Sequence, residues 1–384
     1  MKTLDRILTY IRTPNPLQWK DNDALAVYSR KTGFVHVPDR FGYLNKFSNW
    51  NYINHHENFP DTFYTGSFSD IMFLQAEEII QETLRNNKEL CVLWSGGVDS
   101  TSIVLAFLEV LDKKDLLTII YTESSLVEYP LFFNFLSTLT DIKLKKIGIN
   151  DIGLFCSENG HKYNIVNGFP ADQLFYSTIS KQENIQFGSD WRDFIKEDIA
   201  IQQFEEAFTY YNIPIKTIDE FTWYMNFSCK WLLVKRAIPL WWGQTDNGVI
   251  PFFDRKEFQD WSISNFDTFQ KYDQNNPKYY KLEMKQFINK LFPDEDYLNN
   301  KTKTSSIVKG RIVENLYDKV QPNVSILDGN GNLIIEFITD GNINMKEINE
   351  YYFTKKVFSA IESFAKKTNL NFIVLIDNNM WNIN

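Results

Sequence analysis

Apolar residues recur at regular spacing through the centre of the chain and much less regularly at its start. Residues 76–87 place apolar side chains at helical spacing, which predicts a helix there. The short apolar run 90–94 predicts a strand, and an apolar helix is expected over 102–111. The pattern continues with expected strands at 116–122, 142–147 and 163–166 and an expected helix at 130–139. Strands that alternate with helices indicate an α/β fold with a parallel sheet flanked by helices.

The pattern changes on both sides of this region. Residues 190–242 are expected to be mostly helical insertions. The apolar runs 324–327 and 333–338 flank Asp-Gly-Asn-Gly-Asn, which is a strong hairpin signal. With an expected helix at 345–367 and a strand at 371–376, this end resembles a small α+β appendage. We therefore predict three parts, namely a lead-in segment 1–75, a main domain 76–310 and a C-terminal appendage 311–384.

Composition narrows the class of protein and of partner. The 384 residues are 43% apolar and 23% charged, as in an ordinary globular protein. The net charge of −9 and the pI near 5.2 disfavour nucleic acid as the main partner, since tracking a phosphate backbone needs a basic face. The high aromatic content of 16% indicates an aromatic-rich core, with a stacking platform for bases as the alternative.

Cysteine and histidine placement predicts neither a zinc site nor a disulfide framework. The three cysteines, Cys91, Cys156 and Cys229, lie far apart without a CxxC spacing, which suits a reducing compartment. None of the four histidines, at 36, 55, 56 and 161, has metal-ligand spacing. The charged start of the chain and the lack of about 18 consecutive apolar residues predict a cytoplasmic protein without a membrane partner.

The candidate chemistry lies in Ser-Gly-Gly-Val-Asp-Ser at 95–100, between the expected strand and helix. Two glycines let backbone N–H groups approach a ligand closely, and the helix N-terminus adds its positive dipole end. The hydroxyls of Ser95 and Ser100 add donors, so the loop suits pyrophosphate. Asp99 fits such a site once a divalent cation bridges it to phosphate oxygens. The GxxxxGK[ST] and GxGxxG patterns are both absent, and a chance Gly-Gly turn is the structural alternative.

This loop resembles the PP-loop of the ATP pyrophosphatases, which include asparagine, GMP and NAD synthetases and tRNA-thiolating enzymes. The resemblance implies a Rossmann-like fold of the PP-loop (HUP-like) kind, with ATP and Mg²⁺ as cofactors. It implies that the nucleotide contacts Ser95, Gly96, Gly97, Val98, Asp99 and Ser100. Leu93 and Thr122, at the ends of adjacent expected strands, are our candidates for adenosine contacts, because open α/β sheets bind ligands at the carboxyl ends of their strands.

Residues 167–175 point to the asparagine synthetase branch of that group. They resemble its Ser-Gly-Glu-Gly-x-Asp-Glu-x-Phe loop, with Gly168, Asp172 and Phe175 as the matching positions. The resemblance implies that Asp172 and Asp99 hold Mg²⁺ beside pyrophosphate. The structural alternative is that Asp172 serves as a helix N-cap.

Two later segments extend the resemblance over roughly 85–305. Ile-Pro-Phe-Phe-Asp at 250–254 is similar to the Val-Pro-Phe-Leu-Asp of that family, and a helix is expected after it, over 255–262. Lys278 begins a segment like the Lys-x-x-Leu-Arg helix. Lys301 follows where the family keeps a pyrophosphate-contacting lysine, with Lys303 as the alternative position. Without the resemblance, Lys301 reads as a solvated surface charge.

The sequence also departs from the family pattern. Lys2 stands where the family's glutaminase nucleophile, a cysteine, would be exposed, and the segment before the PP-loop is too short for a glutaminase domain. Phe169 replaces the glutamate that is thought to act on the amine, and phenylalanine accepts no proton. Leu282 replaces the arginine of Lys-x-x-Leu-Arg. Asn247 and Val249 stand where charged residues precede the Pro-Phe-x-Asp segment, so we expect altered substrate recognition.

The resemblance implies an AMP- and pyrophosphate-forming ligase that adenylates a small carboxylate and passes it to an amine. Asp99, Asp172 and Lys301 are the expected catalytic residues, and Gly168 joins the cofactor-binding set. A separate amine-donating or substrate-carrying protein fits the lack of a glutaminase. The alternatives are a PP-loop enzyme acting on RNA or a nucleobase, and a decayed, nucleotide-binding scaffold.

Overall fold

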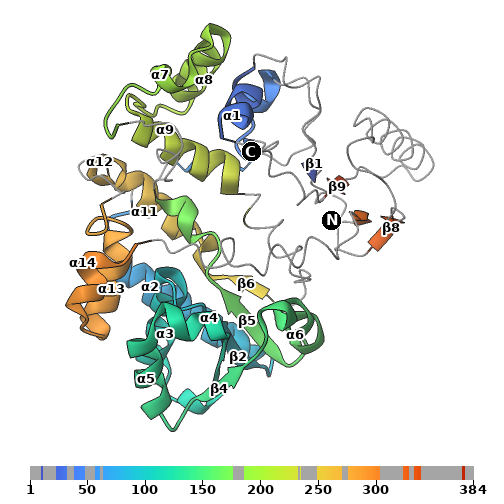
Figure 1. Cartoon of the computed structure of the whole chain (residues 1–384), viewed down its shortest axis with the longest axis vertical. Helices are drawn as coiled ribbons and strands as arrows, with labels where there is room; N and C mark the ends of the chain where they lie inside the picture. The colour runs from blue at the N-terminus through green and yellow to red at the C-terminus, as the bar shows by residue number, and fades with distance from the viewer. Residues whose placement is uncertain are drawn as a thin grey trace. The chain divides into compact units, whose positions relative to one another are not determined.

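The chain divides into two compact units, and each is described by itself. The computed structural model describes residues 10–11, 23–32, 39–47, 57–60, 64–175, 186–231, 234, 249–269 and 276–302, and three further strands within 323–376. One unit combines 1–59, 189–218 and 311–384, and the other combines 60–188 and 219–310 (Figure 1). The three-part division into 1–75, 76–310 and 311–384 stays a prediction. Every candidate site residue lies in the second unit.

A parallel five-stranded sheet forms the centre of the second unit and confirms the predicted α/β class. Its strands are β2 (Glu89–Leu93), β3 (Leu117–Tyr121), β4 (Lys143–Lys146), β5 (Tyr163–Asn167) and β6 (Val249–Pro251). They lie in the order β4-β3-β2-β5-β6, and each pairs with its neighbours in parallel. β2 is fully paired at the centre, which explains its short, apolar sequence without alternation.

The second unit also contains helices. They are α2 (Phe68–Arg85), α3 (Val98–Val110), α4 (Glu123–Glu128), α5 (Pro130–Thr138), α6 (Ile152–Asn159), α9 (Ile218–Tyr224), α11 (Lys256–Ser264), α12 (Phe266–Phe269), α13 (Leu282–Leu291) and α14 (Glu295–Asn300). α9 continues as a π-helical stretch, η7 (Met225–Lys230), and short 3₁₀ turns are η3 (Lys114–Leu116), η4 (Ile149–Asp151), η5 (Ala171–Leu174) and η9 (Phe252–Asp254). In the part of the chain that the structure describes, no helix has the length and apolar character needed to cross a bilayer.

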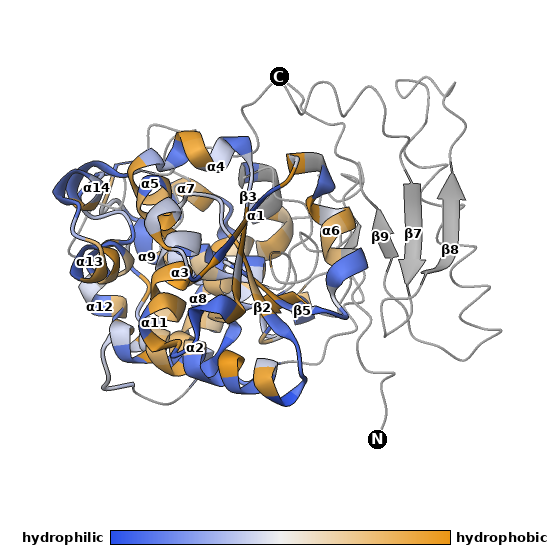
Figure 2. Ribbon diagram, turned by 90° about the horizontal axis from the view of Figure 1, so that it is seen from below, coloured by the Kyte–Doolittle hydropathy of each residue, from blue (hydrophilic) through white to orange (hydrophobic). Residues whose placement is uncertain are grey.

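The two faces of the sheet are covered by different helices. α3 packs on β2, and α2 and α13 pack on α3. On the other face, Phe155 and Cys156 of α6 pack against Cys91, Ile120 and Ile165 of three neighbouring strands. Figure 2 shows α3 and α6 on opposite sides of the strands. Alternate residues of β2 therefore point into two separate apolar layers.

The order of the strands reverses beside β2. The chain runs outward from β2 to β3 and β4, and then crosses through α6 to β5, on the other side of β2. In open α/β sheets, ligands bind at such a reversal, outside the carboxyl ends of the strands. The loops that leave β2 and β5 lie at this point, and they contain the two motifs at 95–100 and 167–175.

The first unit contains helices α1 (Ala24–Thr32), η2 (Leu44–Phe47), α7 (Arg192–Ile195) and α8 (Asp198–Tyr210). Its sheet has the order β1-β9-β7-β8, from β1 (Tyr10–Ile11), β7 (Asn323–Leu327), β8 (Leu333–Ile338) and β9 (Val374–Ile376). β7 and β8 pair antiparallel, as expected for a hairpin. The expected helix at 345–367 lies outside the described residues, so the α+β appendage stays a prediction.

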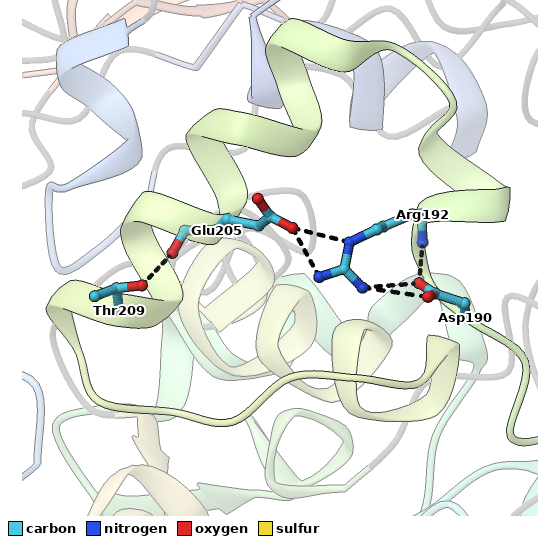
Figure 3. Close-up of polar contacts among 4 residues, drawn as sticks. All are labelled: Asp190, Arg192, Glu205 and Thr209. Atoms are coloured by element: carbon cyan, nitrogen blue, oxygen red, sulfur yellow. Dashed lines mark hydrogen bonds and ion pairs between the residues drawn. The ribbon is translucent and has the colours of Figure 1, made fainter.

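An aromatic cluster and an exposed ion-pair cluster join α7 to α8. Trp191 packs edge-on against Phe204 and Phe208. Arg192 lies between Asp190, at 3.1 Å, and Glu205, at 2.7 Å (Figure 3). The ion-pair cluster of Asp190, Arg192 and Glu205 is exposed to solvent, and its residues lie close together in the sequence.

Candidate functional site

The loop 95–100 is a compact turn held together by its own two serines, Ser95 and Ser100. The backbone N–H of Ser95 donates to Oγ of Ser100 at 3.0 Å, and the two hydroxyls lie 3.0 Å apart. The backbone N–H of Thr101 donates to the carbonyl of Gly97 at 3.0 Å, which begins helix α3. The hydroxyls that the sequence analysis offered as ligand donors therefore also fix the loop.

The two glycines of this loop have different roles. Gly96 has a φ of +81°, and a Cβ there would lie 2.7 Å from the carbonyl oxygen of Ser125 and from Cβ of Glu128. The fold itself therefore requires glycine at 96. Gly97 has an ordinary φ of −77°, and a Cβ there would meet nothing closer than Oγ of Ser95 at 3.4 Å. Packing does not explain glycine at 97, whereas a ligand approaching the backbone would.

Gly97 is also the N-cap of α3, and it makes no side-chain capping bond. By position, the amides of Val98, Asp99 and Ser100 are the first of the helix and lie at its N-terminal end. The 13-residue helix directs its positive end to the same point. This geometry suits an anion, as the sequence predicted for phosphate.

The second loop, 167–175, leaves β5 and is held from several sides. The backbone N–H of Phe169 donates to Oδ1 of Asn167 at 3.1 Å, and the carbonyl of Phe169 accepts from the N–H of Phe253 at 3.1 Å. The side-chain amide of Asn226 donates to the carbonyls of Asp172 and Phe175, each at 3.2 Å. Asp172 lies inside η5, whose N-cap is Pro170, so its carboxylate is not a helix cap.

The two loops meet closely. A Cβ on Gly168 would lie 3.1 Å from Cβ of Asp99, so the approach leaves little room for any larger residue. Asp172 belongs to the same loop as Gly168, so this approach brings the loops that carry the two predicted carboxylates, Asp99 and Asp172, next to each other.

Lys281 joins these two carboxylates. Its Nζ lies 2.5 Å from Oδ1 of Asp172 and also donates a hydrogen bond to Oδ1 of Asp99. The side chain of Lys281 is 3% exposed, against 28% for Asp99 and 36% for Asp172. The residue stands before α13 in the left-handed region, with φ 46° and ψ 47°. We name Asp99, Asp172 and Lys281 the Lys281 cluster.

The charges of this cluster are strongly coupled. Burial alone would lower the pKa of Lys281, but the negative charges of Asp172 and Asp99 outweigh it and hold the pKa well above its usual value. Tyr280 lies beside the cluster, with its ring centroid 5.6 Å from Nζ of Lys281. Burial raises the pKa of Tyr280, so its hydroxyl stays neutral.

Lys301 also reaches the PP-loop region, but beside its first glycine. It forms an ion pair with Glu128 of α4, and both side chains are largely buried. Glu128 is the residue that a Cβ on Gly96 would meet. The structure thus places Lys301 near the loop, while the contact with pyrophosphate stays a prediction.

Both lysines are carried by α13, α14 and the turn before them. Lys285, one turn after Lys281, is fully buried and donates to the carbonyls of Pro277 at 2.5 Å and Leu298 at 2.7 Å. It therefore ties the turn that carries Lys281 to the helix that ends at Lys301. Burial lowers the pKa of Lys285 to about 8.

The two candidate adenosine contacts lie at the carboxyl ends of neighbouring strands, β2 and β3. Leu93 is part-buried and packs against the apolar layer under α6. Thr122 begins α4, where its hydroxyl lies 2.7 Å from that of Ser124. Their contact with adenosine stays a prediction.

Sequence reasoning missed Lys281. The quoted Lys-x-x-Leu-Arg pattern places leucine at this position, and the expected helix from Lys278 begins instead at Leu282. The usable signal was the replacement of that apolar position by a charge. A lone lysine gives no sign in sequence that two carboxylates will surround it.

Mg²⁺ was predicted between Asp99 and Asp172. Among the described residues, no group of three or more His, Cys, Asp or Glu side chains could hold a metal ion. Two carboxylates could still serve Mg²⁺ when phosphates complete its shell. In the arrangement found here, however, an ammonium lies between them, and a cation bound by both would have to displace it.

Comparisons with known proteins assign the chain to no family. No protein-family model matches the sequence, and no curated protein matches it either. The resemblance to the PP-loop ATP pyrophosphatases therefore rests on the motifs and on their placement.

Proposed function

We propose that this protein binds ATP at the PP-loop and forms an acyl-adenylate, as an AMP-forming ligase similar to asparagine synthetase. The observation that carries the proposal is the placement of both motifs at the strand-order reversal. One loop leaves β2 and the other leaves β5, and Lys281 joins them through Asp99 and Asp172. Unrelated turns would not be expected to share this position.

The PP-loop would hold the pyrophosphate part of ATP. The first amides of α3 and the uncovered backbone at Gly97 suit the phosphate oxygens. Gly97 is the residue whose identity the fold leaves unexplained, so a ligand at this point accounts for it. Mg²⁺ would enter with ATP and neutralise part of the phosphate charge.

The reaction would proceed in two steps. A carboxylate oxygen of the substrate attacks the α-phosphorus, an acyl–phosphate bond forms, and the bond to the β-phosphate oxygen breaks to release pyrophosphate. An amine then attacks the acyl carbon, loses a proton and displaces AMP. The α3 amides and Lys301 would stabilise the departing pyrophosphate by position and charge.

The acceptor differs from that of the resembled family. Phe169, at the position of the family glutamate, places an apolar side chain where a base would act, and its backbone N–H and carbonyl help to hold the loop. The base for the incoming amine must therefore come from elsewhere, or the amine must enter already neutral.

A second candidate, a nucleotide-binding protein without the chemistry, is favoured by one observation. The two carboxylates expected to work on Mg²⁺ are already paired with an ammonium. Such a protein would bind ATP without releasing pyrophosphate.

Exchange of labelled pyrophosphate into ATP tests the proposal directly. The protein is incubated with Mg²⁺, ATP and a panel of carboxylic acids. We expect exchange that depends on one acid and falls about a hundredfold in Asp99→Asn, which corresponds to roughly 3 kcal/mol in the barrier. Arg192→Met, on the exposed cluster of the other unit, is the matched control and should exchange normally.

Two other outcomes are informative. ATP binding without exchange for any acid would favour the nucleotide-binding candidate. A lack of ATP binding would overturn the proposal altogether.

A further inference from the structure

Lys281 occupies a position that has the properties of a cation site. Its Nζ contacts one oxygen of Asp172 at 2.5 Å and one of Asp99, and its side chain is 3% exposed. The ring of Tyr280 lies on another side, with its centroid 5.6 Å away. Negative groups and an aromatic ring thus surround a single positive charge.

The same place would not accept a divalent cation as it stands. Mg²⁺ and Mn²⁺ need oxygen ligands in a near-octahedral shell, and both carboxylates already point to an ammonium. The ammonium of Lys281 would also repel a divalent cation that bound to the same two carboxylates. Within the described residues, no third acidic, histidine or cysteine side chain joins the group to shift the balance.

The backbone holds Lys281 in this position. The residue has left-handed backbone angles at the N-cap of α13, and its carbonyl accepts the N–H of Lys285 at 3.1 Å. Lys285 in turn is anchored by its Nζ to the carbonyls of Pro277 and Leu298. The turn that positions the ammonium is therefore itself held by hydrogen bonds, unlike the support of a surface side chain.

The geometry points to Lys281 as the resident cation of this site. Its ammonium joins the carboxylates of the two motif loops in place of a divalent metal ion. The protein without nucleotide then binds no divalent cation at Asp99 and Asp172. Removal of the Lys281 side chain would open a divalent-cation site at these two carboxylates. The inference concerns the protein without nucleotide and holds whether or not the protein proves to be a ligase.

Mn²⁺ binding by the full chain, without nucleotide, tests this inference. Unbound Mn²⁺ is counted by electron paramagnetic resonance for wild type, Lys281→Met, Lys281→Met with Asp172→Asn, and Lys290→Met. We expect Lys281→Met to bind Mn²⁺ at least about tenfold more tightly than wild type, and the added Asp172→Asn to remove that gain. Lys290→Met removes an exposed lysine from the same helix, α13, and it should behave as wild type.

Thermal unfolding gives a second readout. Mn²⁺ should raise the unfolding midpoint of Lys281→Met and leave that of wild type unchanged, because a ligand that binds only the folded state stabilises it. A Lys281→Met protein that folds but gains no Mn²⁺ affinity would overturn the inference.

The wild-type chain keeps the test decisive if Lys281→Met does not fold. Wild type and Asp172→Asn should bind Mn²⁺ equally weakly. Wild-type binding that Asp172→Asn abolishes would show that the carboxylates hold a divalent cation despite Lys281, and the inference would be wrong.

Discussion

The Lys281 cluster and the Arg192 cluster each place one cation between two carboxylates, and they differ in almost every other respect. The Lys281 cluster joins residues as far as 182 positions apart, and its cation is 3% exposed. The second cluster joins Arg192 to Asp190 and Glu205, only two and 13 positions away, and its cation is 42% exposed (Figure 3).

The Arg192 cluster lies on the surface of one local segment, whereas the Lys281 cluster joins two loops that are distant in sequence. Water screens the Arg192 cluster, and the surrounding aromatic contacts of Trp191 already join α7 to α8. The Lys281 cluster lies where two loops meet, and removal of its two carboxylates leaves the ammonium buried. Buried pairs add little net stability when complete, but they are costly to break.

The largest effect should come from removal of both carboxylates. Asp99→Asn with Asp172→Asn leaves the ammonium of Lys281 buried without a countercharge, which should lower the free energy of unfolding by about 3–5 kcal/mol. Urea unfolding measures it. A loss below about 1 kcal/mol would place this cluster with ordinary surface pairs.

A smaller effect is expected when the two loops are forced apart. Gly168→Ala adds a Cβ 3.1 Å from that of Asp99, and overpacking of this kind costs about 1–3 kcal/mol. Gly97→Ala is the matched control in the neighbouring loop, since its Cβ meets nothing closer than 3.4 Å and only the capping preference is lost, at about 1 kcal/mol. Equal losses in urea unfolding would show that the close approach of the loops is not required.

Lys285 offers a buried lysine without a carboxylate, and therefore a pH test. Burial lowers its pKa to about 8 from the usual 10.5, so above pH 8 the folded protein binds fewer protons than the unfolded chain. The free energy of unfolding of wild type should then rise with pH relative to that of Lys285→Met. Because the carbonyl acceptors oppose loss of the proton, we expect a gain of about 1 kcal/mol between pH 7.5 and 9.5. A difference that does not change with pH would contradict the lowered pKa.

The smallest effect belongs to the exposed cluster. Arg192→Met should cost less than about 1 kcal/mol, and the cost should vanish in high salt because solvated pairs are weak and screened. Urea unfolding at low and at high salt measures it. A loss as large as that of the Asp99 and Asp172 double variant would remove the distinction between the two clusters.

The sheet was accessible from the sequence because its strands are short apolar runs that end at glycine or polar residues. The expected strand 90–94 is found at Glu89–Leu93, and the expected strand 163–166 at Tyr163–Asn167. Two helices show the limit of this reasoning. α2 begins at Phe68 rather than at 76, because Ser67 and Asp70 form a capping box ahead of the periodic region. α6 was missed, since eight residues with a glycine give little helical periodicity.

The site was accessible only where a local motif defines it. The loop 95–100 combines a turn, two glycines and the start of a helix within six residues, and the second loop, 167–175, resembles part of a known pattern. The ammonium of Lys281 reaches these loops through a tertiary contact between residues that are 182 positions apart in the sequence. A lysine in a polar stretch looks the same in sequence whether water or two carboxylates surround it, so Lys281 needed the structure.

The most direct test of the central claim is the affinity for ATP of wild type and of Gly97→Ala, measured by calorimetry. Glycine at 97 is not required by φ or by packing, so the added methyl group reports on a ligand at the PP-loop. We predict that wild type binds ATP and that Gly97→Ala binds it at least about tenfold more weakly, a loss of about 1.4 kcal/mol, while still folding. Equal affinities, or no binding by wild type, would contradict the assignment of this loop as the nucleotide site.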